Sequence, residues 1–166
     1  MSMTGNFLIT KEFLKELSPC TDGYRWFCET YPDGGKYQEI LDRLCELDRF
    51  CDARWLLDKV GATDDVLEID SIDDKEKNIC FAGSIIASKY LILKNIKAGG
   101  SIKAGEYIEA GGSIKAGGCI KAGENYGVYA GLRVRISDMK EIGYIKAHEK
   151  PKNIMCGYWE YEGYEI

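Results

Sequence analysis

A six-residue repeat in the second half of the chain constrains the fold more than any other feature. The unit reads Ile-x-Ala-Gly, with Lys or Glu at x, and it recurs without interruption at Ile96, Ile102, Ile108, Ile114 and Ile120. A fixed repeat period is typical of solenoids and other repeat folds. A period of six places no apolar stripe along a helix, because helical faces repeat every 3.6 residues.

The alternation inside each unit predicts short β-strands. Successive side chains of a strand point to opposite faces, so Ile and Ala point inward and the residue between them points outward. Glycine then turns the corner, because it tolerates a positive φ that other residues resist. Three units make a coil of 18 residues. We therefore expect a short three-sided β-solenoid of two to three parallel coils over residues 78–136.

This arrangement predicts where the charges lie. Residues 18 apart stack on one face, so Lys97 lies over Lys115. By the same spacing Lys103 lies over Lys121, and Glu109 lies alone on the third face. The four lysines are candidate partner-binding residues that form a basic surface for an acidic partner or for RNA. The alternative is that they only keep exposed faces soluble and block edge pairing.

Residues 1–62 have the pattern of a helical module. Thr10 is a candidate N-cap, and Gly61 fits the position just after the last helix. Turn signals separate four expected helices, at residues 11–17, from 21 or 22 onward, at 37–47 and at 51–60. The residues that we expect to be buried are the repeat isoleucines together with Trp26, Phe27, Leu41, Leu44, Trp55 and Leu56.

The segments on either side of the solenoid differ from it in composition. Residues 63–77 are acidic, and we interpret them as a connector or a first strand, with Asp64 and Asp65 as candidate partner-binding residues. Residues 137–166 alternate like strands around a turn, which predicts a β-hairpin that caps the open solenoid end. Its side chains Tyr158, Trp159 and Tyr161 are further candidates, since aromatic residues are favoured at interfaces. The predicted fold class is α+β.

The net charge of −5 conceals two halves of opposite sign. Residues 1–77 contain 18 acidic against 10 basic side chains, whereas residues 78–166 contain 9 against 12. Nucleic-acid binding needs clustered Lys and Arg, so we do not expect the acidic half to bind nucleic acid directly. The acidic half is therefore interpreted as a solvated helical face, as a surface that binds a basic protein, or as a mimic of DNA.

Seven cysteines and one histidine bear on location and cofactors. The N-terminus lacks the basic and long apolar regions of a signal peptide, and no stretch reaches the length of a membrane span. We therefore expect no membrane association, and reduced thiols in the cytoplasm of a bacterial cell. No Cys-x-x-Cys pair occurs, and His148 alone cannot complete the usual zinc set. We predict no metal and no cofactor.

Catalytic motifs are sparse in this chain. Hexapeptide-repeat acyltransferases share the period, but they build active sites between coils around a histidine base. The repeats here contain no histidine, and His148 follows them. No local motif supports Cys–His catalysis, and no P-loop motif occurs. We predict no catalytic residue and a protein that is not an enzyme.

Two stretches resemble known bacterial proteins. Residues 20–26 (CTDGYRW), 31–34 (YPDG), 41–44 and 53–57 (ARWLL) resemble a small helical module of bacterial, phage and prophage proteins. In that module a Cys, a Gly and a Trp open one helix, and a helix with a Trp-Leu pair closes it. The Ile-Lys-Ala-Gly tract resembles the glycine-rich solenoid that follows this module. It also resembles the longer three-sided solenoid of bactofilins, but bactofilins have disordered tails in place of a helical module.

These features lead to one main functional hypothesis and two alternatives. The resemblance implies a phage or prophage accessory protein that binds and inhibits a host protein, such as a CRISPR nuclease effector, by charge complementarity. The first alternative is a self-assembling β-helical scaffold, with which a homodimer is also compatible. The second is RNA binding through the lysine ladders, which would depend strongly on salt.

Overall fold

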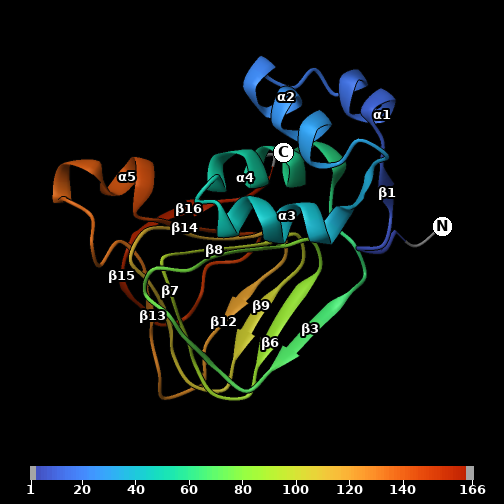
Figure 1. The fold of residues 1–166 in the computed structure, drawn as a ribbon. Coiled ribbons are helices and arrows are strands. Elements are labelled where there is room, and N and C mark those ends of the chain that lie inside the picture. The colour runs from blue at the N-terminus through green and yellow to red at the C-terminus, as the bar shows by residue number, and fades with distance from the viewer. Residues whose placement is uncertain (1–2, 164–166) are drawn as a thin grey trace.

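The computed structural model describes residues 3–163 and consists of a helical module seated on a β-solenoid (Figure 1). The helices of the module lie where the sequence predicts them: α1 (Lys11–Glu16), α2 (Thr21–Thr30), α3 (Tyr37–Glu46) and α4 (Phe50–Val60). A short antiparallel pair, β1 (Leu8–Ile9) with β2 (Gly35–Lys36), ties the first residues to the segment before α3. The predicted α+β class is confirmed.

Local signals account for the ends of these helices. The hydroxyl of Thr10 accepts a hydrogen bond from the Phe13 amide at 3.2 Å, so Thr10 caps α1 as predicted. Helix α4 ends at Gly61, whose φ of +98° suits glycine. Apolar side chains at helical spacing build the module's core, in which Tyr37 and Leu41 are fully buried.

The solenoid has three parallel sheets, which the chain visits in rotation over about five turns. The first sheet contains β3 (Val66–Ile69), β6 (Ser84–Ala87), β9 (Ile102–Ala104) and β12 (Ile120–Lys121). The second contains β4 (Ile72–Asp73), β7 (Leu91–Leu93), β10 (Ile108–Ala110), β13 (Val128–Tyr129) and β15 (Ile154–Cys156). The third contains β5 (Asn78–Phe81), β8 (Asn95–Ala98), β11 (Ile114–Ala116), β14 (Tyr144–Ala147) and β16 (Tyr158–Tyr161).

The repeat stacks in the predicted register. Lys97 pairs with Lys115 in the third sheet, and Lys103 pairs with Lys121 in the first. Glu109 lies on the second sheet, as expected from its place in the repeat. The repeat isoleucines all point inward and are at most 3% exposed, so a ladder of branched side chains fills the solenoid.

The solenoid begins earlier than the sequence suggested. Residues 63–77 contain β3 and β4, which pair in parallel with β6 and β7 of the next turn, so most of the expected connector is the first turn. Leu67, Ile69 and Ile72 pack against the solenoid core. The high acid content concealed this period-two pattern, because the acids occupy outward and corner positions.

The predicted β-hairpin cap at residues 137–166 is wrong. β15 pairs in parallel with β13, and β16 pairs in parallel with β14, so both strands belong to a fifth turn. Gly157, with a φ of +121°, lies at the corner between them. Alternating side chains are common to a hairpin and a coil, so alternation could not distinguish the two. Residues 164–166, which the prediction included, lie outside the described residues.

One excursion interrupts the fourth turn (Figure 1). Between β13 and β14 the chain forms a 3-10 turn, η1 (Ile136–Asp138), and the short helix α5 (Met139–Ile142). The predicted end of the solenoid at residue 136 falls inside this excursion. The coil stacking survives it, since β14 still pairs with β11.

The helical module packs on the outer face of the third sheet. Helices α3 and α4 both contact β5, and Cys80 and Ala82 belong to the module's apolar core. The side-chain amide of Gln38 donates to the Cys80 carbonyl at 3.0 Å and accepts from the Ala82 amide at 2.9 Å. Gln38 thus gives the edge strand β5 two hydrogen bonds of the kind that a neighbouring strand would make.

Candidate functional site

An apolar cleft lies in the helical module between the α1–α2 segment and α4. Its volume is about 280 Å³. Its walls are formed by Leu14, Pro19, Cys20, Gly23, Trp26, Phe27, Ile40, Leu44, Cys51, Asp52, Trp55 and Leu56. Asp52 is the one carboxylate among these side chains, so the cleft suits an apolar group.

Two residues that the sequence placed in the core line this cleft. Trp26 and Trp55 are half-buried, because α2 and α4 do not pack closely against each other. The guanidinium of Arg49 lies 5.3 Å from the Trp26 ring centroid, and Tyr31 meets the same ring edge-on at 5.9 Å. These contacts hold the Trp26 ring at the cleft wall.

Arg49 joins the two walls of the cleft. It makes ion pairs with Asp22 of α2 at 2.7 Å and with Asp52 of α4 at 2.6 Å. Its side chain is 23% exposed, so the pairs are partly shielded from water. One cation between two carboxylates leaves this rim with a net negative charge, which favours a basic group on a ligand.

Two exposed cysteines also line the cleft. The Sγ atom of Cys20 accepts a hydrogen bond from the Gly23 amide at 3.3 Å at the start of α2. Cys51 lies in the first turn of α4. The remaining five cysteines are buried or half-buried. Thiol reagents would therefore reach the folded chain first at the cleft.

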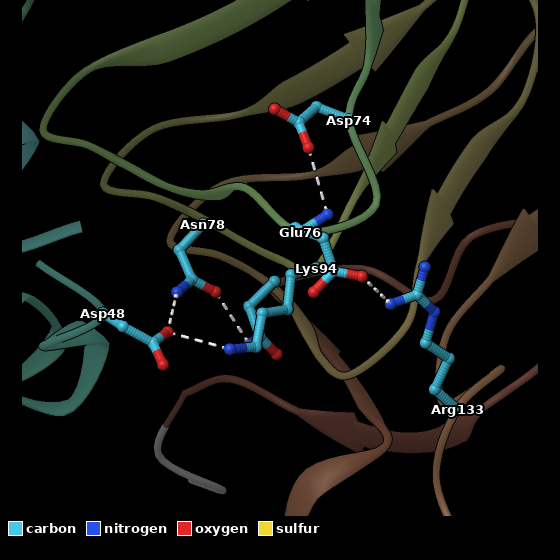
Figure 2. A network of polar contacts seen from close by, with 7 residues as sticks. Asp48, Asp74, Glu76, Asn78, Lys94 and Arg133 are labelled. Carbon is cyan, nitrogen blue, oxygen red and sulfur yellow. Dashed lines mark hydrogen bonds and ion pairs between the residues drawn. The ribbon is translucent and has the colours of Figure 1, made fainter. Parts of the chain in front are cut away.

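A polar network fixes the module to the first turn of the solenoid (Figure 2). The carboxylate of Asp48, between α3 and α4, accepts hydrogen bonds from Asn78 at 3.0 Å and from Lys94 at 2.8 Å. Lys94 first, and Asn78 next, lower the pKa of Asp48 below its usual value. The donors come from two successive turns, so the contact orients the module against both.

A second group of polar contacts, around Arg133, runs along the solenoid axis (Figure 2). Its guanidinium pairs with Glu76 of the first turn, while its backbone amide donates to the Gly111 carbonyl of the third turn at 3.0 Å. The side chain therefore crosses the third and second turns. A Cβ on Gly111 would lie 3.2 Å from the Arg133 side chain, so glycine leaves the room for this strap.

One pair of candidate lysines is covered by the module. Lys97 is 3% exposed, and its Nζ lies 2.6 Å from the Asp58 carboxylate and 3.2 Å from the Arg54 carbonyl. Lys115 lies 3.7 Å from Asp58 and 3.1 Å from Glu162. The expectation that this ladder faces solvent is wrong, because α4 packs on the outer face of the sheet that carries it.

The other candidate lysines face solvent. Lys103 and Lys121 are exposed on the first sheet, in one row with Ile86. Asp64 and Asp65 lie at the start of the first turn, where the Asp64 amide donates to the Met3 carbonyl at 3.2 Å. The Asp65 carboxylate accepts a hydrogen bond from the Gly5 amide. Asp64 and Asp65 together therefore hold the N-terminal residues to the solenoid.

The candidate aromatic residues all lie on β16, the last strand of the third sheet. Trp159 is half-buried and packs on the solenoid core, whereas Tyr158 and Tyr161 are 41% and 44% exposed. Lys140 of α5 lies over the Tyr158 ring at 5.8 Å. The structure therefore places these residues on a different face from Lys103, and the sequence candidates do not form one site.

Two further findings concern metals and membranes. Within residues 3–163 no group of three or more His, Cys, Asp or Glu side chains is placed to hold a metal ion. No helix in the same part of the chain is long and apolar enough to cross a membrane.

The comparisons with known proteins bear on the helical module. Residues 1–63 match the family model of the YdhT N-terminal domain. The match ends before β3, so the cleft lies wholly inside it. Neither the curated proteins nor the solved structures yielded a match.

The cleft was missed by sequence reasoning, although its signal was present. Cys20, Gly23, Trp26 and Trp55 belong to the motif that carried the resemblance to a helical module, and all of them line the cleft. The motif residues therefore share a surface as well as a sequence pattern.

Proposed function

We propose that this chain is a non-enzymatic protein-binding protein whose helical module receives an apolar side chain of its partner. The cleft between α2 and α4 carries the proposal, because its walls are almost entirely apolar and include the half-buried Trp26 and Trp55. Tryptophan is enriched among the residues that dominate binding energy at interfaces. Covering both rings would bury apolar surface that the free chain leaves in contact with water.

The rim of the cleft selects among partners. Asp22 and Asp52 share the single cation of Arg49, so a lysine or arginine beside the apolar anchor gains a favourable contact. We expect the bound segment to be a short amphipathic helix with a basic flank, seated by its apolar face.

The solenoid serves as a rigid mount for this site. Gln38, Asp48 and Lys97 make contacts that tie the module to β5 of the first turn and to Lys94 and β8 of the second turn. A site held in this way loses little conformational entropy when a partner binds.

The identity of the partner is proposed from the resemblance to phage and prophage proteins. We propose a host defence protein, such as a CRISPR nuclease effector, since a nucleic-acid groove supplies the basic residues that an acidic surface complements. The seven free cysteines support the cytoplasm of a bacterial cell as the place of action.

Thiol chemistry at the cleft tests this proposal. A bulky maleimide attached at Cys20 and Cys51 obstructs the cleft of the tagged wild-type chain. The matched control carries Cys20→Ser and Cys51→Ser, is treated with the same reagent, and keeps a good capping residue at position 20. Each chain is used to capture partners from bacterial lysates that contain CRISPR and other defence systems, with identification by mass spectrometry.

We expect a stoichiometric partner with the untreated chain and with the treated control, and about tenfold less with the treated wild-type chain. A partner held at full yield on the obstructed chain would exclude the cleft as its binding site. Recovery of the bait alone in every arm would exclude a defence protein as the partner.

Self-assembly is a second candidate function, because both ends of the solenoid are strand edges. β3 and β4 are outermost at the first turn, where Val66 is 51% exposed and Leu67 is only half-buried. A strand of another copy fits such an edge. Sedimentation over a range of concentrations tests this: particles that grow with concentration would support a scaffold, and a monomer at every concentration would exclude it.

A further inference from the structure

A second surface, on the outer face of the second sheet, is independent of the cleft. A shallow groove of about 700 Å³ lies there over the third to fifth turns. Its walls include the tyrosines Tyr107, Tyr126 and Tyr129 and the glutamates Glu109 and Glu124. Among the described residues that line this groove there is no lysine or arginine.

The stacking of successive turns brings three tyrosine side chains together at one corner of the solenoid. Tyr90, Tyr107 and Tyr126 occupy one corner of the solenoid in successive turns. The Tyr90 and Tyr107 rings stack with centroids 5.2 Å apart and planes 3° from parallel. The Tyr126 ring is tilted by 41° from Tyr107 at 6.3 Å and is 43% exposed, so it ends the stack at the groove. Tyr129 of β13 lies directly beside Glu109 of β10.

The groove's carboxylates lack a cation. Within residues 3–163 neither Glu109 nor Glu124 forms an ion pair. Lys75 and Arg133 lie in an adjoining hollow on the other side of Glu109, where Arg133 is already paired with Glu76. Burial beside aromatic rings disfavours the charged form of the Glu109 carboxylate, and a cation that enters the groove would stabilise that charged form.

The electrostatics of Tyr107 agree with this geometry. Burial raises the pKa of Tyr107, and the neighbouring Tyr90 and Glu109 raise it further. The Glu109 charge therefore acts on the ring that forms the groove wall.

We propose that this groove binds an organic cation, an alkylammonium or guanidinium group, between its tyrosine rings and the carboxylates of Glu109 and Glu124. Aromatic rings attract such cations through their faces, and carboxylates bind them by charge-assisted hydrogen bonds. The same chemistry occurs in free polyamines and in the lysine and arginine side chains of proteins. The floor of the groove is a rigid parallel sheet, so it is formed before the ligand arrives.

Isothermal titration calorimetry on the full chain tests the proposal with two probes. Spermidine represents the free polyamine, and the blocked peptide acetyl-Gly-Arg-Gly-Lys-Gly-amide represents a protein segment. We expect saturable binding of at least one probe, and the probe that binds identifies the source of the cation. Glu109→Gln should weaken that binding about tenfold, because it removes a charged acceptor. Tyr126→Leu should weaken it about twofold to fivefold, whereas Tyr126→Phe keeps the ring and the affinity.

The matched control is Glu149→Gln, which makes the same change of charge at an exposed position after β14. Equal losses in Glu109→Gln and Glu149→Gln would overturn the proposal, because binding would then follow net charge alone. Absence of saturable heat with both probes, or unchanged affinity in Tyr126→Leu, would also overturn it. Thermal unfolding of each variant by circular dichroism separates loss of binding from loss of fold. The cleft variants leave this groove unchanged, so the two binding sites succeed or fail separately.

Discussion

The buried ion pair beneath α4 tests how the helical module is held to the solenoid. The Lys97 side chain is 4% exposed, and its Nζ lies 2.6 Å from the Asp58 carboxylate. Asp58→Ala removes this carboxylate and leaves the ammonium with the Arg54 carbonyl at 3.2 Å. Lys97→Met instead removes the charge and keeps most of the side-chain volume. The two variants therefore separate the burial of a charge from the packing of its carbon chain.

The burial of the two side chains sets the expected loss of stability in each variant. Removing one partner of a fully buried ion pair costs about 3–5 kcal/mol. The Asp58 side chain is 55% exposed, so water screens part of the interaction, and we expect Asp58→Ala to lose about 2 kcal/mol. Lys97→Met should remain within about 1 kcal/mol of the wild type, because apolar replacement of a buried charge is often neutral or stabilising.

The same pair gives a dependence on pH. Burial lowers the pKa of Lys97 below its ordinary value of 10.5, and Asp58 opposes that shift. Between the two pKa values the unfolded chain binds more protons than the folded chain, so the free energy of unfolding contributed by Lys97 rises with pH. Removing Asp58 lowers the folded pKa further. The difference in free energy of unfolding between the wild type and Asp58→Ala should therefore shrink as the pH approaches the ordinary pKa of lysine.

Urea unfolding followed by circular dichroism, at about pH 7 and about pH 10, measures both effects. We expect Asp58→Ala to be the least stable variant at neutral pH and to recover part of its loss at alkaline pH. Equal losses in the two variants would mean that packing, and not charge, governs this contact. Wild-type stability in Asp58→Ala would refute the reasoning that the buried ammonium depends on this carboxylate.

Three other predictions concern the solenoid and its thiols. Ile108→Ala should lower the free energy of unfolding by about 2–5 kcal/mol because Ile108 is fully buried. Ile86→Ala should change it by only about 0.5 kcal/mol because Ile86 is exposed. Urea unfolding compares the two variants, and equal losses would contradict an inward-pointing ladder of repeat isoleucines. Gly157→Ala should cost about 1–3 kcal/mol at a φ of +121°, and an unchanged melting temperature would argue against this corner. Burial raises the pKa of the Cys45 thiol to about 12 and also raises that of Cys80, so a thiol assay of the folded chain at about pH 8 should leave both unreacted. Rapid reaction of either would show that the interface between α3 and β5 opens.

The solenoid was predictable because its pattern is local. A period of two inside a period of six admits one arrangement of inward and outward side chains, and the pairing of Lys103 with Lys121 followed from counting residues. The first and fifth turns escaped prediction because they keep the inward alternation without the full Ile-x-Ala-Gly unit, although the fifth turn retains Gly157 at its corner. Leu67 and Trp159 pack on the core in those turns outside any such unit.

What the sequence could not predict depends on contacts between distant segments. The local pattern makes Lys97 and Lys103 equivalent outward positions, yet the module covers the first and leaves the second in solvent. The same limit applies to the cleft. Helical spacing assigned Trp26 and Trp55 to the core, but their exposure depends on how far α2 lies from α4. Arg49 sets that separation through ion pairs that no local pattern encodes.

The regular stacking of turns also makes the length of this chain adjustable. Because Ile96 stacks on Ile114 and Lys97 on Lys115, a tandem duplication of residues 96–113 would insert a complete turn without moving any inward side chain to the outside. Each inserted turn would carry the later turns about 4.8 Å farther from the helices. Such an insertion would break the strap from Arg133 to Glu76 and would also move Lys115 away from Asp58. The solenoid can thus act as a molecular ruler, in which duplication or loss of one 18-residue turn changes the distance between the cleft and the groove in fixed steps.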